Sequence, residues 1–270
     1  MELGYYMSKS REIGRLTFLG TGTSQGVPMI GCECAVCRSD DPRDRRLRTS
    51  AVVHLGEQNL LIDTTPEFRL QCLRNAIGRI DAVLITHAHA DHIFGMDDLR
   101  RFNQLQKKPI PVYAGPDHMP ILEKVFSYAR SERVTEHIDL PHLDFRLVEG
   151  EFTLLGCRIL PLPLPHGRTR VLGYRIGNLA YCTDLSAMPE EAVARLQGLD
   201  VLVLGALRSK PHPAHLSIDQ AVELARRVAA RRTYFIHMGH QISHRYYEGL
   251  LPEGMFLAYD GLTIDVGGTD

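Results

Sequence analysis

Metal-binding chemistry is concentrated in one short segment, where His87, His89, Asp91 and His92 form a His-x-His-x-Asp-His pattern. The segment follows an apolar run over 81–86. A buried strand there would fix the backbone and deliver side chains to a crevice at its carboxyl end. These four groups cannot all bind a single ion without strain. We therefore predict two ions, with His87 and His89 on one, and Asp91 and His92 on the other.

A site for two ions needs further ligands, and the sequence offers three candidates. His166, Asp184 and His237 each follow an apolar run that is predicted to be a strand. The carboxylate of Asp184 is a group that can bridge two cations. A lone histidine at a strand end is more often structural. The prediction therefore depends on all of the candidates together, each of which lies at the same end of its own strand.

A second metal site is indicated by three cysteines in six residues, Cys32, Cys34 and Cys37. This Cys-x-Cys-x-x-Cys loop can wrap a tetrahedral zinc ion with sulfur ligands at about 2.3 Å. We expect His240 to supply the fourth ligand, because it lies three residues beyond His237 and can point away from the first site. The alternative is a surface loop of reduced cysteines. Cysteines in apolar stretches are expected in the core: Cys72, Cys157 and Cys182.

The elements that position these residues alternate between strands and helices. Strands are expected at 15–20, 50–55, 59–62, 81–86, 111–114, 145–148, 152–155, 157–162, 172–176, 179–182, 200–204, 233–236, 256–259 and 262–266. Helices are expected from Pro66 with Thr65 as N-cap, at 116–128, 189–195 and 217–231, and near Tyr246. The alternation predicts one α/β domain over 15–266, in which two mixed sheets are covered by helices, after a tail over 1–14.

Composition narrows the function classes. The 270 residues carry 31 Lys and Arg against 32 Asp and Glu, which is not the basic footprint of a protein that grips nucleic acid. No apolar run reaches the roughly 18 residues of a membrane-spanning helix. Residues 1–11 lack the hydrophobic stretch of a signal peptide. We therefore predict a cytoplasmic protein without a membrane partner.

The ligand pattern resembles the metallo-β-lactamase fold superfamily over roughly residues 15–266, beginning with Gly-Thr-Gly at 20–22. The resemblance implies an αββα sandwich with a dinuclear metal site at the edge of both sheets. It also implies how the ligands divide: one ion on His87, His89 and His166, the other on Asp91, His92 and His237, with Asp184 bridging. The superfamily includes hydrolases of many substrates, so the fold alone does not give the reaction.

The cysteine loop narrows the resemblance to the PhnP-like phosphodiesterases of the carbon–phosphorus lyase pathway. Other matching features are Leu-Gly-Thr-Gly-Thr-Ser at 19–24, Gly-Val-Pro at 26–28 and the pair His237 and His240. The resemblance implies that His215 contacts the substrate phosphate and helps the leaving group, although His212 lies close enough for the register to slip. It implies hydrolysis of small cyclic or linear phosphodiesters, including a ribosyl 1,2-cyclic phosphate.

The chemistry expected at such a site is hydrolysis by a hydroxide held between two ions. Asp91 would orient this nucleophile, and His215 as imidazolium would steady the phosphoryl group or protonate the departing oxygen. Zinc or manganese fits the site of mixed imidazole and oxygen donors, whereas the cysteine site favours zinc. Thr86 and Thr183 are candidates for orienting the ligands.

Two other functions stay open. One is a ribonuclease Z-like tRNA 3′-processing endonuclease, against which the balanced charge argues. The other is a metal-binding protein of the same fold without catalysis, against which the complete ligand set argues. The expected partner is a small phosphodiester, and a homodimer is left open. The remaining histidines are expected at the surface or in packing: His54, His118, His137, His142, His212 and His244.

Overall fold

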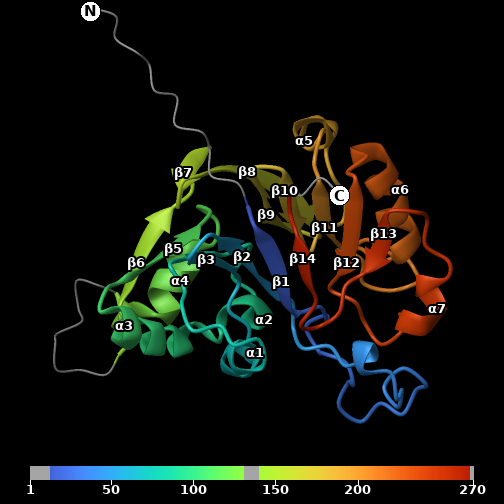
Figure 1. Cartoon of the computed structure of the whole chain (residues 1–270), viewed down its shortest axis with the longest axis horizontal. Helices are drawn as coiled ribbons and strands as arrows, with labels where there is room; N and C mark the ends of the chain where they lie inside the picture. Colours follow the sequence, from blue (N-terminus) through green and yellow to red (C-terminus); the bar gives the residue numbers. More distant parts are fainter. Residues whose placement is uncertain (1–12, 131–139, 268–270) are drawn as a thin grey trace, which may run out of the picture.

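Apolar runs build two sheets of seven strands each that pack face to face (Figure 1). The structure is a computed structural model and describes residues 13–130 and 140–267. The strands of the first sheet are β1 (Arg15–Gly20), β2 (Ser50–Leu55), β3 (Gln58–Ile62), β4 (Ala82–Leu84), β5 (Ile110–Ala114), β6 (Leu143–Leu147) and β14 (Thr263–Asp265). Those of the second are β7 (Phe152–Leu154), β8 (Cys157–His166), β9 (Thr169–Ile176), β10 (Leu179–Cys182), β11 (Val201–Gly205), β12 (Arg232–Ile236) and β13 (Met255–Leu257).

Both sheets are mixed. The first has the order β14-β1-β2-β3-β4-β5-β6, with parallel pairing from β3 to β6. The second has the order β13-β12-β11-β10-β9-β8-β7, with parallel pairing from β10 to β13. Because β10, β11 and β12 run parallel, their carboxyl ends meet at one edge of the sheet.

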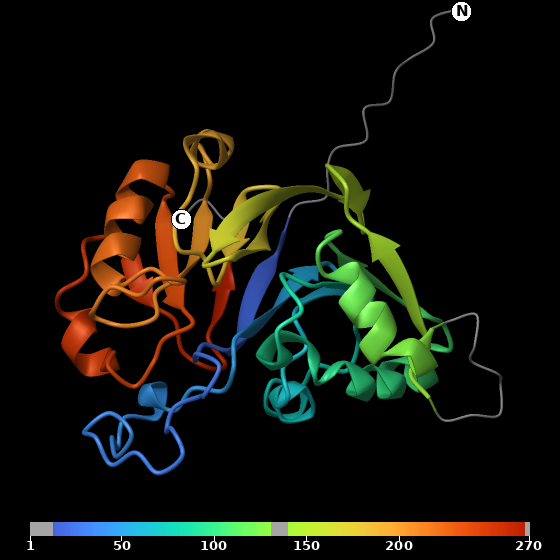
Figure 2. The same cartoon turned by 180° about the vertical axis from the view of Figure 1, so that it is seen from behind.

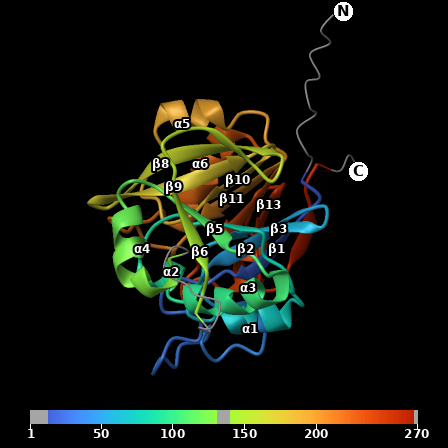
Figure 3. The same cartoon turned by 90° about the vertical axis from the view of Figure 1, so that its left-hand side faces the viewer.

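Helices cover the outer face of each sheet (Figures 1 and 2). The α-helices are α1 (Phe68–Arg74), α2 (Ala90–Ile93), α3 (Arg100–Gln106), α4 (Met119–Val125), α5 (Glu190–Arg195), α6 (Ile218–Val228) and α7 (His244–Glu248). The short 3₁₀ helices are η1 (Pro42–Asp44), η2 (Met96–Leu99) and η3 (Ser127–Ala129). Figure 3 shows the sheets from the side, between α5 on one outer face and α1 and α3 on the other. The predicted αββα sandwich is confirmed.

The hydrophobic core has the three parts that this layering requires. One cluster lies between the sheets and includes Phe18, Tyr174 and Val203. The other two lie between each sheet and its helices. The longest helix, α6, buries a single apolar face at helical spacing, and Ser217 with Gln220 forms the capping box that starts it. None of the helices in the described residues is long and apolar enough to cross a membrane.

The structure corrects the expected extent of β8. The predicted strand covers 157–162, whereas β8 continues to His166. Pro161, Pro163 and Pro165 alternate along it, so the N–H group that each lacks would face away from β9. The other neighbour, β7, pairs only with the first residues of β8, so these prolines cost no ladder hydrogen bond and protect an open edge.

Two other boundaries are also corrected. Helix α1 begins at Phe68 rather than at Pro66, because the Thr65 hydroxyl accepts the Glu67 N–H in a turn before the helix. The domain begins before the predicted residue 15, because Ile13 is buried in the core between the sheets. The rest of the predicted tail, residues 1–12, lies outside the described residues.

Candidate metal centre

The predicted ligands lie at the ends of strands from both sheets, and strained backbone aims several side chains inward. Asp63, Asp184 and His237 follow β3, β10 and β12, and their φ angles are 60°, 54° and 58°. A non-glycine residue in this left-handed region costs about 1–3 kcal/mol. Such residues cluster at functional sites, where the surrounding fold holds them in place. The turn of the backbone at each strand end is what directs these side chains toward a common centre.

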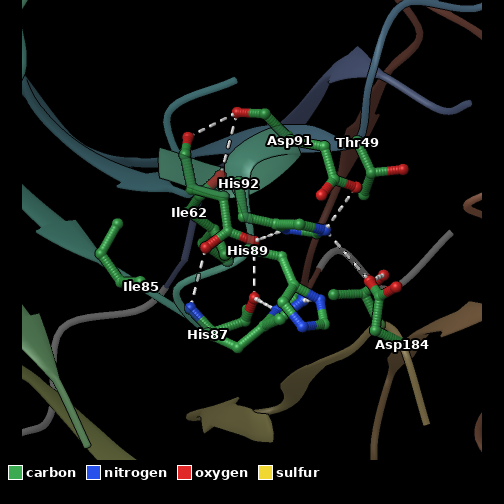
Figure 4. A network of polar contacts seen from close by, with 12 residues as sticks. Thr49, Ile62, Ile85, His87, His89, Asp91, His92 and Asp184 are labelled. Atoms are coloured by element: carbon green, nitrogen blue, oxygen red, sulfur yellow. Dashed lines mark hydrogen bonds and ion pairs between the residues drawn. The ribbon is translucent and has the colours of Figure 1, made fainter. Parts of the chain in front are cut away.

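The structure brings the predicted ligands together in overlapping groups. In each group the potential ligand atoms lie within 4.8 Å of one another: His87, His89 and His166; Asp91, His92 and His237; His87, His92 and Asp184. The first two groups are the sets that the resemblance assigned to separate ions. Asp184 reaches both groups, because its ligand atom lies within 4.8 Å of those of His87 and His166. Its carboxylate oxygens lie 3.3 Å from His92 Nε2 (Figure 4) and 3.0 Å from His237 Nε2.

Hydrogen bonds fix which ring nitrogens face the centre. His92 Nδ1 lies 2.7 Å from Asp63 Oδ2, and His166 Nδ1 donates to the carbonyl oxygen of Ala214 at 2.9 Å. His87 Nδ1 lies 3.0 Å from the Thr86 hydroxyl. The Nε2 atom of each of these rings is therefore the one left to bind an ion, as outer hydrogen bonds to metal-binding histidines commonly ensure.

Unsatisfied buried atoms show that this centre fits metal ions. His92 Nε2 and both ring nitrogens of His237 are buried without a hydrogen-bond partner among the described residues. Buried polar atoms are rarely left unpaired, and each one calls for an explanation. A divalent ion bound by imidazole nitrogens and carboxylate oxygens supplies that explanation for His92 Nε2 and for one ring nitrogen of His237, because it binds the lone pair of each.

The charged groups of the centre balance one another: burial would lower the pKa of His92, but the facing Asp63 and Asp184 carboxylates hold it well above its usual value. Burial alone would raise the pKa of Asp184, but the facing His237 and His92 rings outweigh it and hold that pKa well below its usual range. Burial and the neighbouring His92 ring lower the pKa of His87 well below its usual value. An ionised carboxylate and a neutral imidazole are the forms that bind metal ions.

Thr86 and Thr183 both hydrogen-bond to carboxylates of the centre, and of the two only Thr86 also contacts a predicted ligand imidazole, that of His87. The Thr86 hydroxyl donates to Asp63 Oδ2 at 2.7 Å, and its backbone N–H donates to Asp63 Oδ1 at 2.8 Å. The Thr183 hydroxyl donates to Asp184 Oδ2 at 2.7 Å.

His215, and not His212, reaches this centre. Its ring stacks on His237 with centroids 5.1 Å apart, and its Nδ1 lies 3.4 Å from Asp184 Oδ1. His212 packs against His215 and accepts a hydrogen bond from the Ala214 N–H. Burial lowers the pKa of His215 to about 3, so its ring is neutral at pH 7 in this environment. The expected imidazolium therefore requires an anionic substrate beside the ring.

The cysteines and His240 also meet. The Nδ1 atom of His240 lies 3.1, 3.4 and 3.7 Å from the sulfur atoms of Cys32, Cys34 and Cys37. Hydrogen bonding from the Cys37 N–H lowers the pKa of Cys34 to about 6, whereas burial raises that of Cys37 to about 11. These donors fit the tetrahedral Cys₃His site that zinc prefers.

The His237–His240 segment is bonded to residues on either side of the cysteine loop. Before the loop, the Thr21 carbonyl accepts the Met238 N–H at 3.0 Å. After the loop, the buried guanidinium of Arg46 donates to Gly239 O at 3.2 Å and to Asp44 Oδ1 at 2.8 Å. The Gly-Thr-Gly turn lets the backbone after the loop come close, since a Cβ on Gly20 would lie 2.0 Å from the Arg48 carbonyl oxygen.

Sequence reasoning missed two residues of this region, Asp63 and His118. Asp63 is completely buried and contacts both Thr86 and His92. The sequence did indicate Asp63, because this aspartate directly follows the apolar strand β3, and Asp184 was singled out for the same kind of position after a strand. His118 was expected to be a surface or packing residue, but its Nδ1 accepts the Ala88 N–H within the metal-binding segment. Nothing in its local sequence indicates that contact.

The other cysteines and histidines lie apart from the centre. Cys72, Cys157 and Cys182 are buried, as predicted. His54 bonds to Thr17 and Asn59 in the first sheet. His137 lies outside the described residues.

Comparison with known proteins agrees with this geometry. A family model described as a β-lactamase superfamily domain matches residues 58–238. The chain belongs to this superfamily. A crystal structure titled as that of a new diphosphatase from the PhnP family is 43% identical, with a TM-score of 0.87 over 93% of this chain and 96% of that one. This places the chain in the PhnP family of the metallo-β-lactamase fold.

Two further relatives define the reach of the similarity. An octanoyltransferase of Porphyromonas gingivalis is 35% identical over 92% of this chain, which spans only 51% of that protein's length. Zinc-bound PqqB from Methylobacterium extorquens has a TM-score of 0.73, covering 93% of this chain and all of that one. At 21% identity, PqqB shares the fold alone.

Proposed function

We propose that this protein hydrolyses small cyclic or linear phosphodiesters with two divalent metal ions bound at the His/Asp centre. The observation that carries the proposal is the position of Asp184, which lies within reach of ligand groups on both sides of the centre. Two ions so placed would lower the pKa of a bound water toward about 7 and offset negative charge on a phosphoryl group. Zinc or manganese suits these donors, and zinc suits the cysteine site.

Asp91 and His215 have separate roles in this proposal. Asp91 is the more exposed carboxylate of the centre, with 15% of its side chain accessible and Oδ2 3.3 Å from His92 Nε2. From there it would orient the attacking water. His215 would offer a ring N–H to the phosphoryl group or to the departing oxygen. Water adds to phosphorus as the phosphorus–oxygen bond breaks, and the departing oxygen takes up a proton.

A diphosphate is a second candidate substrate, because the 43% identical PhnP-family protein is titled a diphosphatase. Both reactions attack a phosphorus atom and expel an oxygen, so the same centre would serve either. The ribonuclease Z-like activity has less support, because the net charge of −1 offers little attraction to a long polyanion.

The test combines metal analysis with a substrate panel. The purified protein would be assayed with bis(p-nitrophenyl) phosphate, cyclic nucleotides, linear dinucleotides and nucleoside diphosphate sugars, before and after chelation and readdition of Zn²⁺ or Mn²⁺. We expect three bound ions per chain and metal-dependent turnover of small phosphodiesters. Turnover of diphosphates alone would favour the second candidate. A metal-loaded protein that hydrolyses none of these substrates would contradict both.

A further inference from the structure

The carboxylate of Asp260 joins two segments that are far from it in the chain. Its Oδ1 accepts the Thr21 N–H at 2.9 Å and the Thr21 hydroxyl at 2.8 Å, and its Oδ2 accepts the Leu47 N–H at 2.7 Å. Asp260 itself lies between β13 and β14, where the chain passes from the second sheet to the first. The Gly22 N–H also donates to Leu47 O at 2.8 Å, so the two segments are bonded to each other as well.

Thr21 is bonded on its other side to the residue that follows the predicted ligand His237. The Thr21 carbonyl accepts the Met238 N–H at 3.0 Å, and the Met238 carbonyl accepts the Thr23 N–H at 3.1 Å. The turn at 20–23 is therefore the middle of three bonded segments, with Asp260 closing one side and the backbone after His237 forming the other.

His237 has a backbone conformation that needs such support. Its φ of 58° lies in the left-handed region, which costs a residue other than glycine about 1–3 kcal/mol. Relaxation of this strain would move the imidazole relative to Asp91 and His92, with which it forms one predicted ligand group. The bonds from the turn to Met238 hold the backbone directly after His237 and so resist that relaxation. We call the ion of this ligand group the His237 ion.

The burial of Asp260 indicates a role other than general stability. Burial raises the pKa of Asp260 to about 6, although its hydrogen bonds and the Arg46 guanidinium act in the opposite direction. A carboxyl group whose pKa is higher in the folded protein than in the unfolded chain loses stability when it ionises, so its charge does not stabilise the fold at pH 7. What the carboxylate does supply is two oxygens that accept three donors from two segments.

We propose that Asp260 is a positioning residue for the His237 ion, acting through Thr21 and Met238 without touching the ion. The other predicted ion of the centre, called the His166 ion, has separate ligands: His87, His89 and His166. Among the described residues, no hydrogen bond joins these three side chains to the turn at 20–23. Loss of the Asp260 carboxylate should therefore weaken one ion and spare the other. This inference rests on the proposed function, because it concerns one of its two ions.

The test measures how tightly the centre binds each ion. Mn²⁺ would be titrated calorimetrically into wild type and Asp260→Asn after chelation of the bound metal. An amide has one acceptor oxygen, so at least one of the three donors loses its partner whichever way the side chain lies. We expect the wild type to bind two Mn²⁺ ions and Asp260→Asn to bind one of them about 10- to 100-fold more weakly, the usual effect of losing an outer contact.

His89→Ala identifies which ion is affected. This substitution removes a ligand of the His166 ion and should leave the His237 ion in place. Adding Asp260→Asn should then weaken the remaining ion by the same 10- to 100-fold or so. If the double variant bound its remaining ion as tightly as His89→Ala does, the proposal would be overturned.

Thr21→Val tests the path from Asp260 to Met238. It removes the hydroxyl bond and keeps the backbone bonds, so it should weaken the same ion by less than Asp260→Asn does. Combined with Asp260→Asn, its effect should be less than additive, because both changes act through one contact. Full additivity would contradict a path through Thr21.

Asp200→Asn is the matched control for stability. Its carboxylate likewise accepts several donors, from the Gly267 N–H and the side chains of Arg231 and Arg232. It precedes β11 and so lies at the end of the sheet opposite to the metal centre. Both variants should lower the melting temperature, and only Asp260→Asn should change Mn²⁺ binding. Equal weakening in both variants would mean a general loss of stability and would overturn the positioning role.

The same titrations separate this inference from the proposed function. Two ions bound with equal affinity by wild type and Asp260→Asn would overturn the inference and leave the proposed function standing. A wild type that binds a single ion at the centre would contradict the two-ion proposal. In that case weaker binding of this ion by Asp260→Asn would still support the role of Asp260, and unchanged binding would overturn it.

Discussion

The two ligand clusters of this protein are built in opposite ways. The His/Asp centre collects side chains from the ends of strands in both sheets. Among its predicted ligands, His87, His92, Asp184 and His237 are nearly inaccessible, at 1%, 0%, 2% and 2% exposure, whereas His89 is exposed. The cysteine cluster takes three ligands from one loop and only His240 from another part of the chain. The first geometry is imposed by the fold, whereas the second depends on the loop closing onto a single distant residue.

Outer contacts show the same difference. Asp63, Thr86 and the Ala214 carbonyl hold individual rings of the His/Asp centre in place. The cysteine sulfurs contact mainly one another, nearby backbone N–H groups and His240. We infer that strand ends preserve a reactive geometry without the ions, and that the cysteine loop needs its zinc to stay ordered. The following variants test this comparison, beginning with the largest expected effect.

Asp184→Asn replaces the shared carboxylate with a neutral amide of the same size. We expect kcat/KM for bis(p-nitrophenyl) phosphate to fall by more than about 1000-fold, because both ions lose a ligand. Metal analysis should show that the cysteine site keeps its zinc. If the variant retained full turnover, Asp184 would have no role in catalysis despite its central position.

His215→Ala removes a ring that lies against the centre without belonging to either predicted ligand set. We expect both ions of the centre to remain bound, while kcat falls by about 100- to 10,000-fold, the usual range for acid–base catalysis. His212→Ala, in the same segment before α6, should behave like the wild type. Loss of metal from His215→Ala would make His215 a ligand instead.

Asp63→Asn weakens the outer support of His92 and leaves every predicted ligand in place. Loss of such a contact typically costs about 10- to 100-fold in metal affinity or activity. Competition with a chelator and steady-state kinetics would measure both. Asp144→Asn removes a carboxylate paired with Arg146 at the outer strand β6 and serves as the control. Equal behaviour of the two variants would mean that the strand ends hold their ligands without Asp63.

Cys34→Ser tests the loop cluster and should affect activity least. We expect the loss of one zinc ion and a lower melting temperature, with activity reduced by less than about 10-fold, since strand ends hold the reactive centre. Cys72→Ser is the matched control, because replacing this buried cysteine should lower stability without changing the metal content. An unchanged zinc count in Cys34→Ser would refute the structural zinc site.

Much of the fold followed from local patterns. Continuous apolar runs such as 179–182 and 201–204 predict buried strands, and Ser217 with Gln220 marks the start of α6. The failures occurred where pairing partners decide the outcome. The predicted strand at 157–162 stops short of the end of β8 at His166, and the prolines along β8 are tolerated because β7 pairs only with its first residues. Thr65 and Pro66 suggest a helix start, but the chain first makes a turn.

The sequence by itself determined which side chains can do chemistry, because metal ligands must be particular residue types and the turns after strands place them at predictable positions. It did not show that Asp63 supports His92, that His118 contacts the metal-binding segment, or that Arg168 and Arg170 lie beside His89. These relations join residues far apart in the chain: the first two arise when neighbouring strands of the first sheet pair, and the third when the two sheets pack together. The tertiary structure therefore decided how the centre is supported and what lies next to it, because contacts between distant segments leave no local pattern.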